Sequence, residues 1–298
     1  MFDPTKLVTY VNGRIMPHGE ALRAMQEQEM QSTGGFFDAE RTFNRRIFKL
    51  GQHLQRLYNG LNYTKIDPGV TMEEMEGLTM EVLEANLPLL EPGDEYVVTQ
   101  VVSTGAASTP EEPVVNVVIY CQPLDFTRFA MSYLRGVQVI TPATYGVRQQ
   151  DAVSPPEEPP QQVYPLMTGQ DGGITECKGG NFLFVQDGRI KLPDRRNVLP
   201  GVSMHTALEL AGSLEIPVDE GDYAIYDVYK ADEAFVSSTR HCMVPVATLN
   251  GFSLGEGVPG PVAGRLLDAW REMVGIDFVQ QALDHLPGGS ATSKCDAG

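Results

Sequence analysis

The segment ITECKGGNFLFVQDG at residues 174–188 constrains the fold more than any other part of this sequence. Its β-branched and aromatic residues on either side of a Lys-Gly-Gly sequence predict strands joined by a tight turn. Glu176 stands at the end of the first strand, directly before the turn. Because glycines let other groups approach the backbone, this turn can hold the carboxylate of Glu176 beside a bound ring. We expect Glu176 to contact a ligand; the alternative is a strand-end glutamate that faces solvent.

The composition indicates a globular protein with an acidic surface. The 298 residues are 42% hydrophobic, which is enough to bury a core in two modest domains. The formal net charge is −17, and only 22 residues are Lys or Arg. Nucleic acids and anionic membranes are bound through clustered positive charge. We therefore expect neither a nucleic acid nor a membrane as a partner.

The N-terminus and the cysteines predict a cytoplasmic protein. MFDPTKLVTYVNG lacks a basic start followed by an apolar run, and no apolar stretch approaches the roughly 18 residues of a membrane span. The cysteines form no CxxC pair and have no histidines at ligand spacing, which argues against a disulfide framework and against a metal site. We expect free thiols at all of them, namely Cys121, Cys177, Cys242 and Cys295.

Turn and periodicity signals predict an N-terminal α/β domain over residues 1–121. Asn12-Gly13 lies between two β-rich stretches and has the commonest chemistry of a two-residue hairpin. Apolar residues at helical spacing predict two helices, and two β-branched runs predict a pair of strands that closes the domain. In chain order, these helices and strands cover 53–66, 72–90, 95–104 and 113–123.

The rest of the chain predicts a linker at 122–130 and a second domain over 131–286. This domain opens with YLRGVQVITPA and ends in a helix over GRLLDAWREMVG. Between them we expect a strand at PLMTG, a turn at QDGG and one strand over NFLFVQDGRIKLP. Residues 287–298 are small and polar, and we expect them to be disordered. Together these elements predict an α/β fold, with α+β character, in two domains.

Several further segments, in the correct order, resemble the motifs of one enzyme family. Together with the segment around Glu176, they resemble the fold-type IV, or class IV, pyridoxal-phosphate (PLP) enzymes: branched-chain aminotransferases, D-amino acid aminotransferases and aminodeoxychorismate lyases. The resemblance implies a homodimer with PLP at the junction of two domains, acting on an amino acid or a related amine. The segments are VNGRIMP (11–17), FFDAERTFNRRIFKLGQHLQRL (36–57), LPGVSMHTALELA (199–211), ADEAFVSSTRHCMVPVATLNG (231–251) and GPVAGRLLDAW (260–270).

The resemblance implies two direct contacts to PLP from charged side chains. In the family, the glutamate that matches Glu176 bonds the pyridine nitrogen, and the arginine that matches Arg56 grips the phosphate. Arg56 lies in HLQRL, on a predicted amphipathic helix. Its alternative is therefore a surface arginine whose aliphatic stem covers apolar groups. His53 precedes Arg56 by one helical turn and could support it, although a lone helix histidine is more often structural.

Further phosphate contacts are implied at two turns. Gly201, Val202 and Ser203 open a predicted helix, where backbone N–H groups can point at one anion. Ser238 and Thr239 match hydroxyl residues that face the phosphate in the family. A serine-threonine turn between strands needs no ligand, so these two residues can also be purely local.

The family's Schiff-base lysine has no clear counterpart in this sequence. No lysine occurs between Lys65 and Lys178, and residues 145–165 carry five prolines where the family has a lysine and a helix. Because proline disfavours helix, this stretch reads as if the helix had been excised. Lys178 is a candidate replacement, since strand alternation would place it on the face of Glu176 if the strand continued that far. Its alternative is a turn lysine in water.

The contacts to a substrate carboxylate also differ from those of the family. The D-amino acid branch of the family uses an arginine in a TRG sequence for the substrate carboxylate, whereas this chain has VSTG at 102–105. Arg240 and Arg148 are the candidate carboxylate contacts. The alternative for Arg240 is a surface charge, and the alternative for Arg148 is a contact with the phosphate. No residue set predicts a metal.

These observations leave three readings of the function. The first is a class IV aminotransferase or related PLP lyase with a relocated amine. The second is a lysine-independent enzyme that uses the same pocket for other chemistry, with or without PLP. The third is a non-catalytic homologue that binds a ligand or another subunit. Retention of Glu176, Arg56 and the Gly201 turn argues mildly against the third reading.

Overall fold

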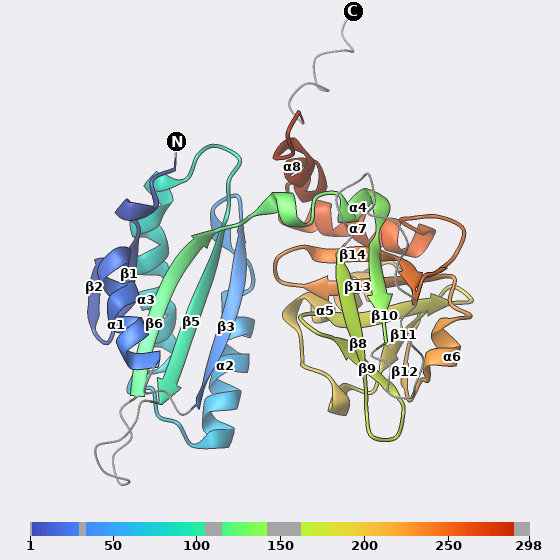
Figure 1. The fold of residues 1–298 in the computed structure, drawn as a ribbon, viewed down its shortest axis with the longest axis horizontal. Helices are drawn as coiled ribbons and strands as arrows, with labels where there is room; N and C mark the ends of the chain where they lie inside the picture. The colour runs from blue at the N-terminus through green and yellow to red at the C-terminus, as the bar shows by residue number, and fades with distance from the viewer. Residues whose placement is uncertain (1, 30–33, 105–114, 142–161, 289–298) are drawn as a thin grey trace, which may run out of the picture. The chain divides into compact units, whose positions relative to one another are not determined.

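The computed structural model describes residues 2–29, 34–104, 115–141 and 162–288. The chain forms two compact units, Met1–Leu124 and Asp125–Gly298. Within the described residues, each unit contains one sheet with its own helices, which confirms the α/β fold class (Figure 1). None of the described helices combines the length and the apolar character needed to cross a membrane.

The first unit begins with the hairpin that Asn12-Gly13 predicts. β1 (Val8–Val11) pairs with β2 (Arg14–Pro17), and the turn residues Asn12 and Gly13 have φ angles of 46° and 90°. Positive φ at both positions is the requirement of a type I′ turn. The sheet order is β2-β1-β6-β5-β3-β4, and the antiparallel β5–β6 pair confirms the two strands predicted at the end of the domain. The other strands are β3 (Gly34–Phe43), β4 (Arg46–Ile47), β5 (Tyr96–Thr104) and β6 (Val115–Pro123).

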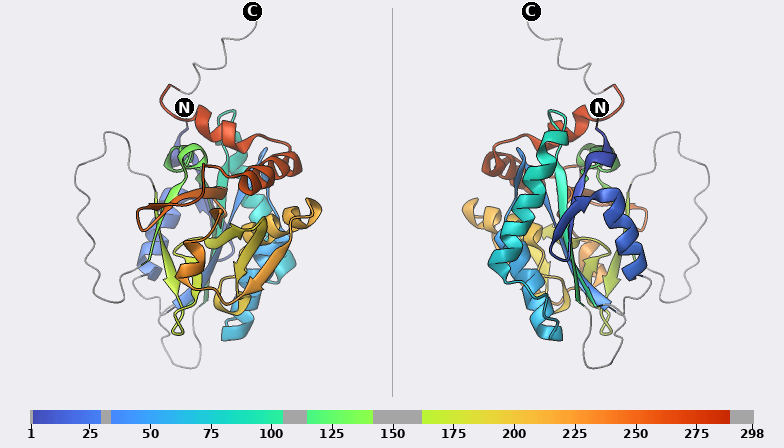
Figure 2. Two further views of the ribbon diagram at one scale, coloured as in Figure 1. Left: turned by 90° about the vertical axis from the view of Figure 1, so that its right-hand side faces the viewer. Right: turned by 90° about the vertical axis from the view of Figure 1, so that its left-hand side faces the viewer.

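Helices lie on both faces of this sheet (Figures 1 and 2). The predicted helices are confirmed as α2 (Leu50–Thr64) and α3 (Met72–Asn86), which share one core with the sheet. A helix that was not predicted, α1 (His18–Glu29), packs Ala21 on the opposite face. Alternation along β6 explains the division, because Val117 and Ile119 enter the first core and Val118 enters the second. Short 3-10 turns occupy Pro4–Lys6 and Leu87–Leu89.

Residues 122–130, which were predicted as a linker, contain packed structure. β6 continues to Pro123, a 3-10 turn covers Phe126–Arg128, and the side chains of Phe126, Phe129 and Ala130 are buried. The short helix α4 (Ser132–Arg135) and strand β7 (Val137–Ile140) follow.

The sheet of the second unit has the order β12-β11-β10-β13-β14-β7-β8-β9, with β15 paired to β14. It curls so that its two ends meet: the N–H of Ile174, in β9, donates to the carbonyl of Tyr223, just after β12, at 2.8 Å. Gly173 and Ala224 form a β-bridge at the same place. The strands are β8 (Val163–Thr168), β9 (Ile174–Cys177), β10 (Asn181–Gln186), β11 (Arg189–Pro193), β12 (Val218–Gly221), β13 (Glu233–Ser238), β14 (Cys242–Leu249) and β15 (Phe252–Ser253).

One predicted strand of this unit is wrong. The segment 181–193 is not a single strand but a hairpin of β10 and β11, in which Gln186 pairs with Arg189. Asp187 and Gly188 form the turn with φ angles of 53° and 69°. An Asp-Gly pair is itself a strong hairpin signal, because both residues tolerate positive φ. The apolar pattern on both sides masked that signal.

The helices of the second unit begin at turns that the sequence marks. α5 (Val202–Ser213) starts after Gly201, as predicted, and α7 (Pro261–Val274) confirms the predicted C-terminal helix. α5 and α7 pack against each other and against β13. The short helices α6 (Ile225–Val228) and α8 (Phe278–Asp284) and a 3-10 turn at Arg195–Asn197 complete the unit.

Some predictions fall on residues that the structure does not describe. Arg148, most of the proline-rich stretch 145–165, Cys295 and most of the tail 287–298 lie there. The described cysteines, Cys121, Cys177 and Cys242, are buried and form no disulfide with one another.

Candidate functional site

Glu176 lies at the end of β9 with its side chain half-buried. Its Oε2 atom accepts a hydrogen bond from Asn181 Nδ2 at 3.0 Å and another from the backbone N–H of Leu199 at 2.8 Å. Within the described residues, both hydrogen bonds to this carboxylate end on Oε2. The carboxylate is therefore held by one oxygen, and its Oε1 atom can accept from a ligand.

Asn181 joins Glu176 to the turn that precedes α5. The side chain of Asn181 is buried, and its Nδ2 atom also donates to the carbonyl of Leu199 at 2.9 Å. A Cβ atom at Gly201 would lie 2.0 Å from Asn181 Oδ1, so only glycine permits this approach. The structure thus links Glu176 and Gly201, two residues that were predicted to contact a ligand, through the side chain of Asn181.

The first turn of α5 presents backbone donors beside Asn181. Gly201 is the N-cap residue and provides no side-chain cap. In the described part of the chain, the N–H groups of Val202, Ser203 and Met204 donate to no acceptor. Such groups at a helix start carry partial positive charge and favour an anion.

Ser237 supplies a second, independent sign of a ligand at this place. Ser237 faces Asn181 in the β10–β13 pairing, so that the two side chains share a face of the sheet. Its side chain is 1% exposed, and among the described residues its Oγ atom has no hydrogen-bond partner. Buried hydroxyls are nearly always hydrogen-bonded, which indicates an additional group here.

The predicted residues Ser238, Thr239 and Arg240 follow Ser237 directly. Ser238 ends β13, and Thr239 and Arg240 form the turn into β14. Ser238 and Thr239 are half-buried, whereas the Arg240 side chain is exposed. The hydroxyl residues therefore lie next to the Ser237 position in the chain.

His241, which follows this turn, belongs to a buried aromatic group. Its Nε2 atom lies 3.0 Å from the hydroxyl of Tyr164, and its carbonyl accepts from the hydroxyl of Tyr133 at 2.8 Å. Burial raises the pKa of Tyr164 to about 12, with a smaller contribution from Cys177. Tyr164 therefore stays protonated and acts as a structural hydrogen-bonding group at neutral pH.

Lys178 lies just beyond β9. The strand ends at Cys177, Lys178 begins the turn to β10, and its side chain is exposed. Its backbone N–H donates to the carbonyl of Pro165 at 2.9 Å. The condition under which alternation would align Lys178 with Glu176, a strand that continues through residue 178, is not met.

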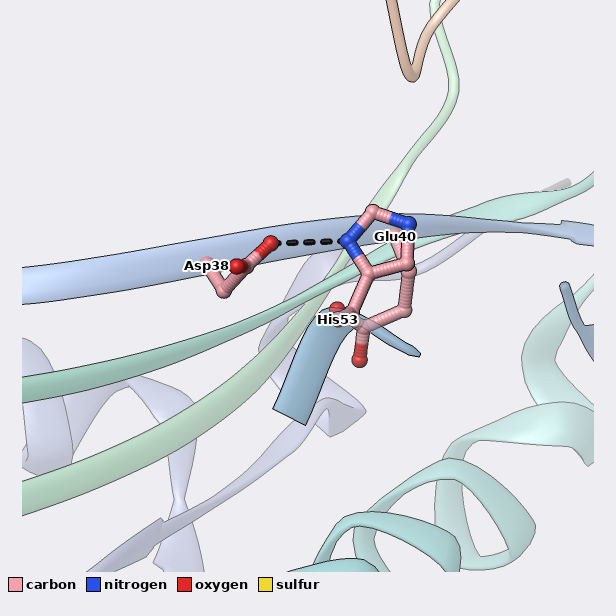
Figure 3. Close-up of side chains that lie close together, drawn as sticks. All are labelled: Asp38, Glu40 and His53. Carbon is pink, nitrogen blue, oxygen red and sulfur yellow. Dashed lines mark hydrogen bonds and ion pairs between the residues drawn. The ribbon is translucent and has the colours of Figure 1, made fainter. Parts of the chain in front are cut away.

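A second polar cluster lies in the first unit, between β3 and α2 (Figure 3). Asp38 Oδ1 lies 2.7 Å from Nδ1 of His53, and Arg56 donates to both carboxylate oxygens of Asp38 at 2.8 and 2.6 Å. Asp38 and His53 are buried, and the Arg56 side chain is 21% exposed. Burial by itself would raise the pKa of Asp38, but the hydrogen bonds from His53 and Arg56 outweigh it and lower the pKa. The Arg56 guanidinium is thus fixed in place by its two hydrogen bonds to Asp38.

Glu40 lies two residues after Asp38 and is completely buried. One of its oxygens accepts from Gln100 Nε2, and the other, Oε2, has no partner among the described residues. Burial raises the pKa of Glu40 to about 8, despite the hydrogen bond from Gln100 that lowers it. Glu40 is therefore protonated and neutral at pH 7.

Asp38, Glu40 and His53 offer potential metal ligands within 4.8 Å of one another. However, both oxygens of Asp38 already accept hydrogen bonds from Arg56. A divalent cation would have to displace the guanidinium or lie beside its positive charge. The arrangement fits an ion-pair network with one neutral acid better than it fits a metal centre.

The sequence alone assigned no role to Asp38, Asn181 or Ser237. The signal for Asp38 was an acid inside the strand-like segment FFDAERTF, since an acid in a covered strand requires a partner. Asn181 follows Gly-Gly at the start of an apolar strand, where a polar side chain is similarly out of place. Ser237 had no distinguishing signal.

Comparisons with known proteins identify relatives of this chain. Residues 164–249, which contain the described part of the Glu176 site, match the model of the family "Amino-transferase class IV". A putative branched-chain-amino-acid aminotransferase of Methanocaldococcus jannaschii is 24% identical over 89% of this chain and 95% of its own length. A D-alanine aminotransferase of Listeria monocytogenes is 24% identical over 86% of this chain and 92% of its own length.

Solved structures show the same fold. The branched-chain amino acid aminotransferase of Escherichia coli superposes with a TM-score of 0.76 at 20% identity, over 90% of this chain and 95% of that chain. The T.th. branched-chain amino acid aminotransferase, complexed with N-(5'-phosphopyridoxyl)-L-glutamate, gives a TM-score of 0.72 at 21% identity, over 90% and 94%.

Proposed function

Because this chain belongs to the class IV aminotransferase family, we propose that it binds PLP and acts on an amino acid or a related amine. The observation that carries the proposal is the hydrogen-bonded set of Glu176, Asn181 and Leu199 at the start of α5. It places an acid and a group of backbone donors in one compact unit.

The Glu176 side fits the pyridine ring of PLP. When bound, PLP supplies an electron sink for carbanion chemistry, and it does so best with a protonated pyridine nitrogen beside an acid. Glu176 is oriented by two donors on Oε2, so its other oxygen can accept from the ring nitrogen. The role of this chain would be to hold that proton on the ring.

The α5 side fits the phosphate. The N–H groups of Val202 and Ser203 are available at the helix start, and Ser237 Oγ is a buried hydroxyl that lacks a partner within the described residues. We assign Ser238 and Thr239 as additional hydroxyl donors and Arg56 as the positive charge. Two nitrogens of the Arg56 guanidinium donate to the Asp38 carboxylate, and this double contact limits how far the guanidinium can turn.

The proposal also requires an amine that can form an imine with PLP. Lys178 remains the candidate, and its exposed position in a turn makes a second function worth testing. No lysine occurs between Lys65 and Lys178. This favours, as the second candidate, an enzyme that uses the same pocket without a lysine, either with PLP held noncovalently or with another phosphorylated ligand. Arg240 and Arg148 are the proposed carboxylate contacts, in a cytoplasmic homodimer.

A reduction experiment tests the proposal. The purified protein is incubated with PLP, its absorbance spectrum is recorded, and it is reduced with borohydride before peptide mass spectrometry. The matched variant is Lys178→Arg, which keeps the charge but cannot form an imine. We expect PLP to bind at a stoichiometry near one and a pyridoxyl group on Lys178 that is lost in the variant.

The other outcomes separate the candidates. PLP that binds without a reducible adduct supports the lysine-independent enzyme. An adduct on another lysine relocates the amine but keeps the aminotransferase proposal. If PLP does not bind at all, the proposal is wrong and the pocket serves a different ligand.

A further inference from the structure

We infer that Asn181 is the positioning residue of this site: it holds the ring acid Glu176 and the phosphate-binding turn of α5 in one fixed geometry. This inference rests on the proposed function, because it concerns the same ligand site. Asn181 would act by positioning Glu176 and the α5 turn and would not itself contact the reacting atoms.

The contacts of Asn181 are directional. Its Nδ2 group has two hydrogens, and one donates to Glu176 Oε2 while the other donates to the carbonyl of Leu199. Both acceptors are oxygens, so this position of the side chain must be a donor. An acceptor placed there would face two other acceptors at about hydrogen-bond distance.

The contact with Gly201 extends the same link to the helix. Asn181 Oδ1 occupies the space that a side chain at Gly201 would need. Leu199, whose N–H and C=O bond to Glu176 and Asn181, is two residues before this glycine. Movement of Asn181 would therefore displace Glu176 and the start of α5 together.

A purely structural role predicts different behaviour from a donor role. If Asn181 only fills space, Asn181→Asp should be tolerated better than Asn181→Ala, because aspartate has nearly the same shape. If Asn181 acts as a double donor, Asn181→Asp should be worse at pH 8, because its carboxylate would face Glu176 Oε2 and the Leu199 carbonyl. Protonation of that aspartate would restore one donor, so lowering the pH should recover part of the loss.

The experiment measures the PLP and inorganic phosphate affinities of the wild type, Asn181→Ala and Asn181→Asp at pH 8 and pH 6. Each variant is compared with the wild type at the same pH, which removes the titration of the ligand itself. Loss of hydrogen bonds to a charged group corresponds to about a tenfold to hundredfold loss in affinity. We expect about tenfold weaker PLP binding in Asn181→Ala and a larger loss in Asn181→Asp at pH 8 than at pH 6.

Two further readouts distinguish positioning from general damage. The absorbance band of bound PLP reports the protonated pyridine, and we expect it to become pH-dependent in Asn181→Ala between pH 6 and pH 8. Asn62→Asp, at an exposed position of α2, adds the same charge elsewhere and should leave both affinities within about twofold. If Asn181→Asp does not fold at pH 8, its melting temperature relative to that of the wild type, measured upward from pH 5.5, gives the same comparison, because a packing role predicts a difference that does not depend on pH.

Two results would overturn the inference, and they can be told apart. Wild-type protein that binds PLP, together with an Asn181→Asp variant that binds at least as well as Asn181→Ala at pH 8, rejects the positioning role alone. Wild-type protein that binds no PLP rejects the proposed function, and the inference with it.

Discussion

The carboxylate of Glu233 lies so close to Gly260 that a Cβ atom on this glycine would be 2.3 Å from Glu233 Cδ. Glu233 is buried, and its two oxygens accept from the backbone N–H groups of Val262 and Ala263 at 2.8 and 2.9 Å. A side chain from β13 thus caps the N-terminus of α7, where a negative charge is favourable. The helix can take this cap only because residue 260 has no side chain.

Gly260→Ala should therefore destabilise the protein. The added methyl group would push Glu233 away from the helix start and leave a buried carboxylate with weaker partners, at a cost of about 2–3 kcal/mol in the free energy of unfolding. Gly264→Ala is the matched control, since a Cβ at this α7 position meets nothing within 4 Å. It should be neutral or stabilising by up to about 1 kcal/mol. Urea denaturation of both variants measures the difference, and equal stabilities would contradict the capping role.

The neutral acid Glu40 should make stability depend on pH. Its pKa in the folded protein is raised to about 8 from the ordinary glutamate value of about 4.5, so between these pH values the folded state binds more protons than the unfolded state. Stability from this residue is fully present below about pH 4.5 and is lost as the pH rises towards 8. Glu40→Gln should remove this loss and raise the melting temperature at pH 8 more than at pH 5.

Glu76→Gln on the exposed surface of α3 provides the control for that experiment. It removes the same charge without a buried partner, and its effect should be small at both pH values. A Glu40→Gln variant whose stability falls with pH as steeply as that of the wild type would show that Glu40 does not hold the proton.

Gly201→Ala should weaken binding at the α5 turn. The methyl group would collide with Asn181 Oδ1, and the first turn of the helix would have to move away from it. We expect at least a tenfold loss in affinity for PLP and for inorganic phosphate. Gly212→Ala, near the end of the same helix and in open space, should change neither affinity by more than about twofold. Isothermal titration calorimetry measures the affinities of both variants. Equal affinities in Gly201→Ala and Gly212→Ala would show that the anion does not bind at the α5 turn.

Arg56→Lys should affect both stability and binding. Lysine keeps the charge but cannot form the two-nitrogen contact with Asp38. The buried Asp38 would keep a weaker partner, which we expect to cost about 1–2 kcal/mol in the free energy of unfolding. Phosphate affinity should fall as well if Arg56 supplies the positive charge. Unchanged phosphate affinity in a destabilised variant would show that Arg56 stabilises the fold through its ion pair with Asp38 and does not bind the phosphate.

Local signals predicted much of the fold. The Asn12-Gly13 turn and the apolar spacing of α2 and α3 each determine a structure within a few residues, so they can be read without knowing what packs on them. The hairpin at Asp187-Gly188 was missed because a continuous apolar pattern was given more weight than the turn residues. The helix α1 was missed because its sequence HGEALRAMQEQE has few apolar residues to reveal a period.

The candidate site was predictable only in part. Glu176 and Gly201 stood in recognisable segments, but their connection through Asn181 depends on how β10 and the turn before α5 approach each other. Similarly, the partnership of Asp38 with Arg56 forms only when α2 packs on β3. Contacts of this kind between distant segments leave no fixed spacing in a single sequence, although a polar residue inside an apolar strand signals that some partner must exist.

The hydrogen bond from Ile174 to Tyr223 has a consequence for self-association. β9 is the last strand of its sheet, and an uncovered last strand exposes backbone groups on which another chain can add a strand. Because Ile174 and Gly173 pair with the segment after β12, part of that edge is already occupied by the same chain. The curl of the sheet thereby protects the strand that carries Glu176 against intermolecular β-pairing and the aggregation that follows from it.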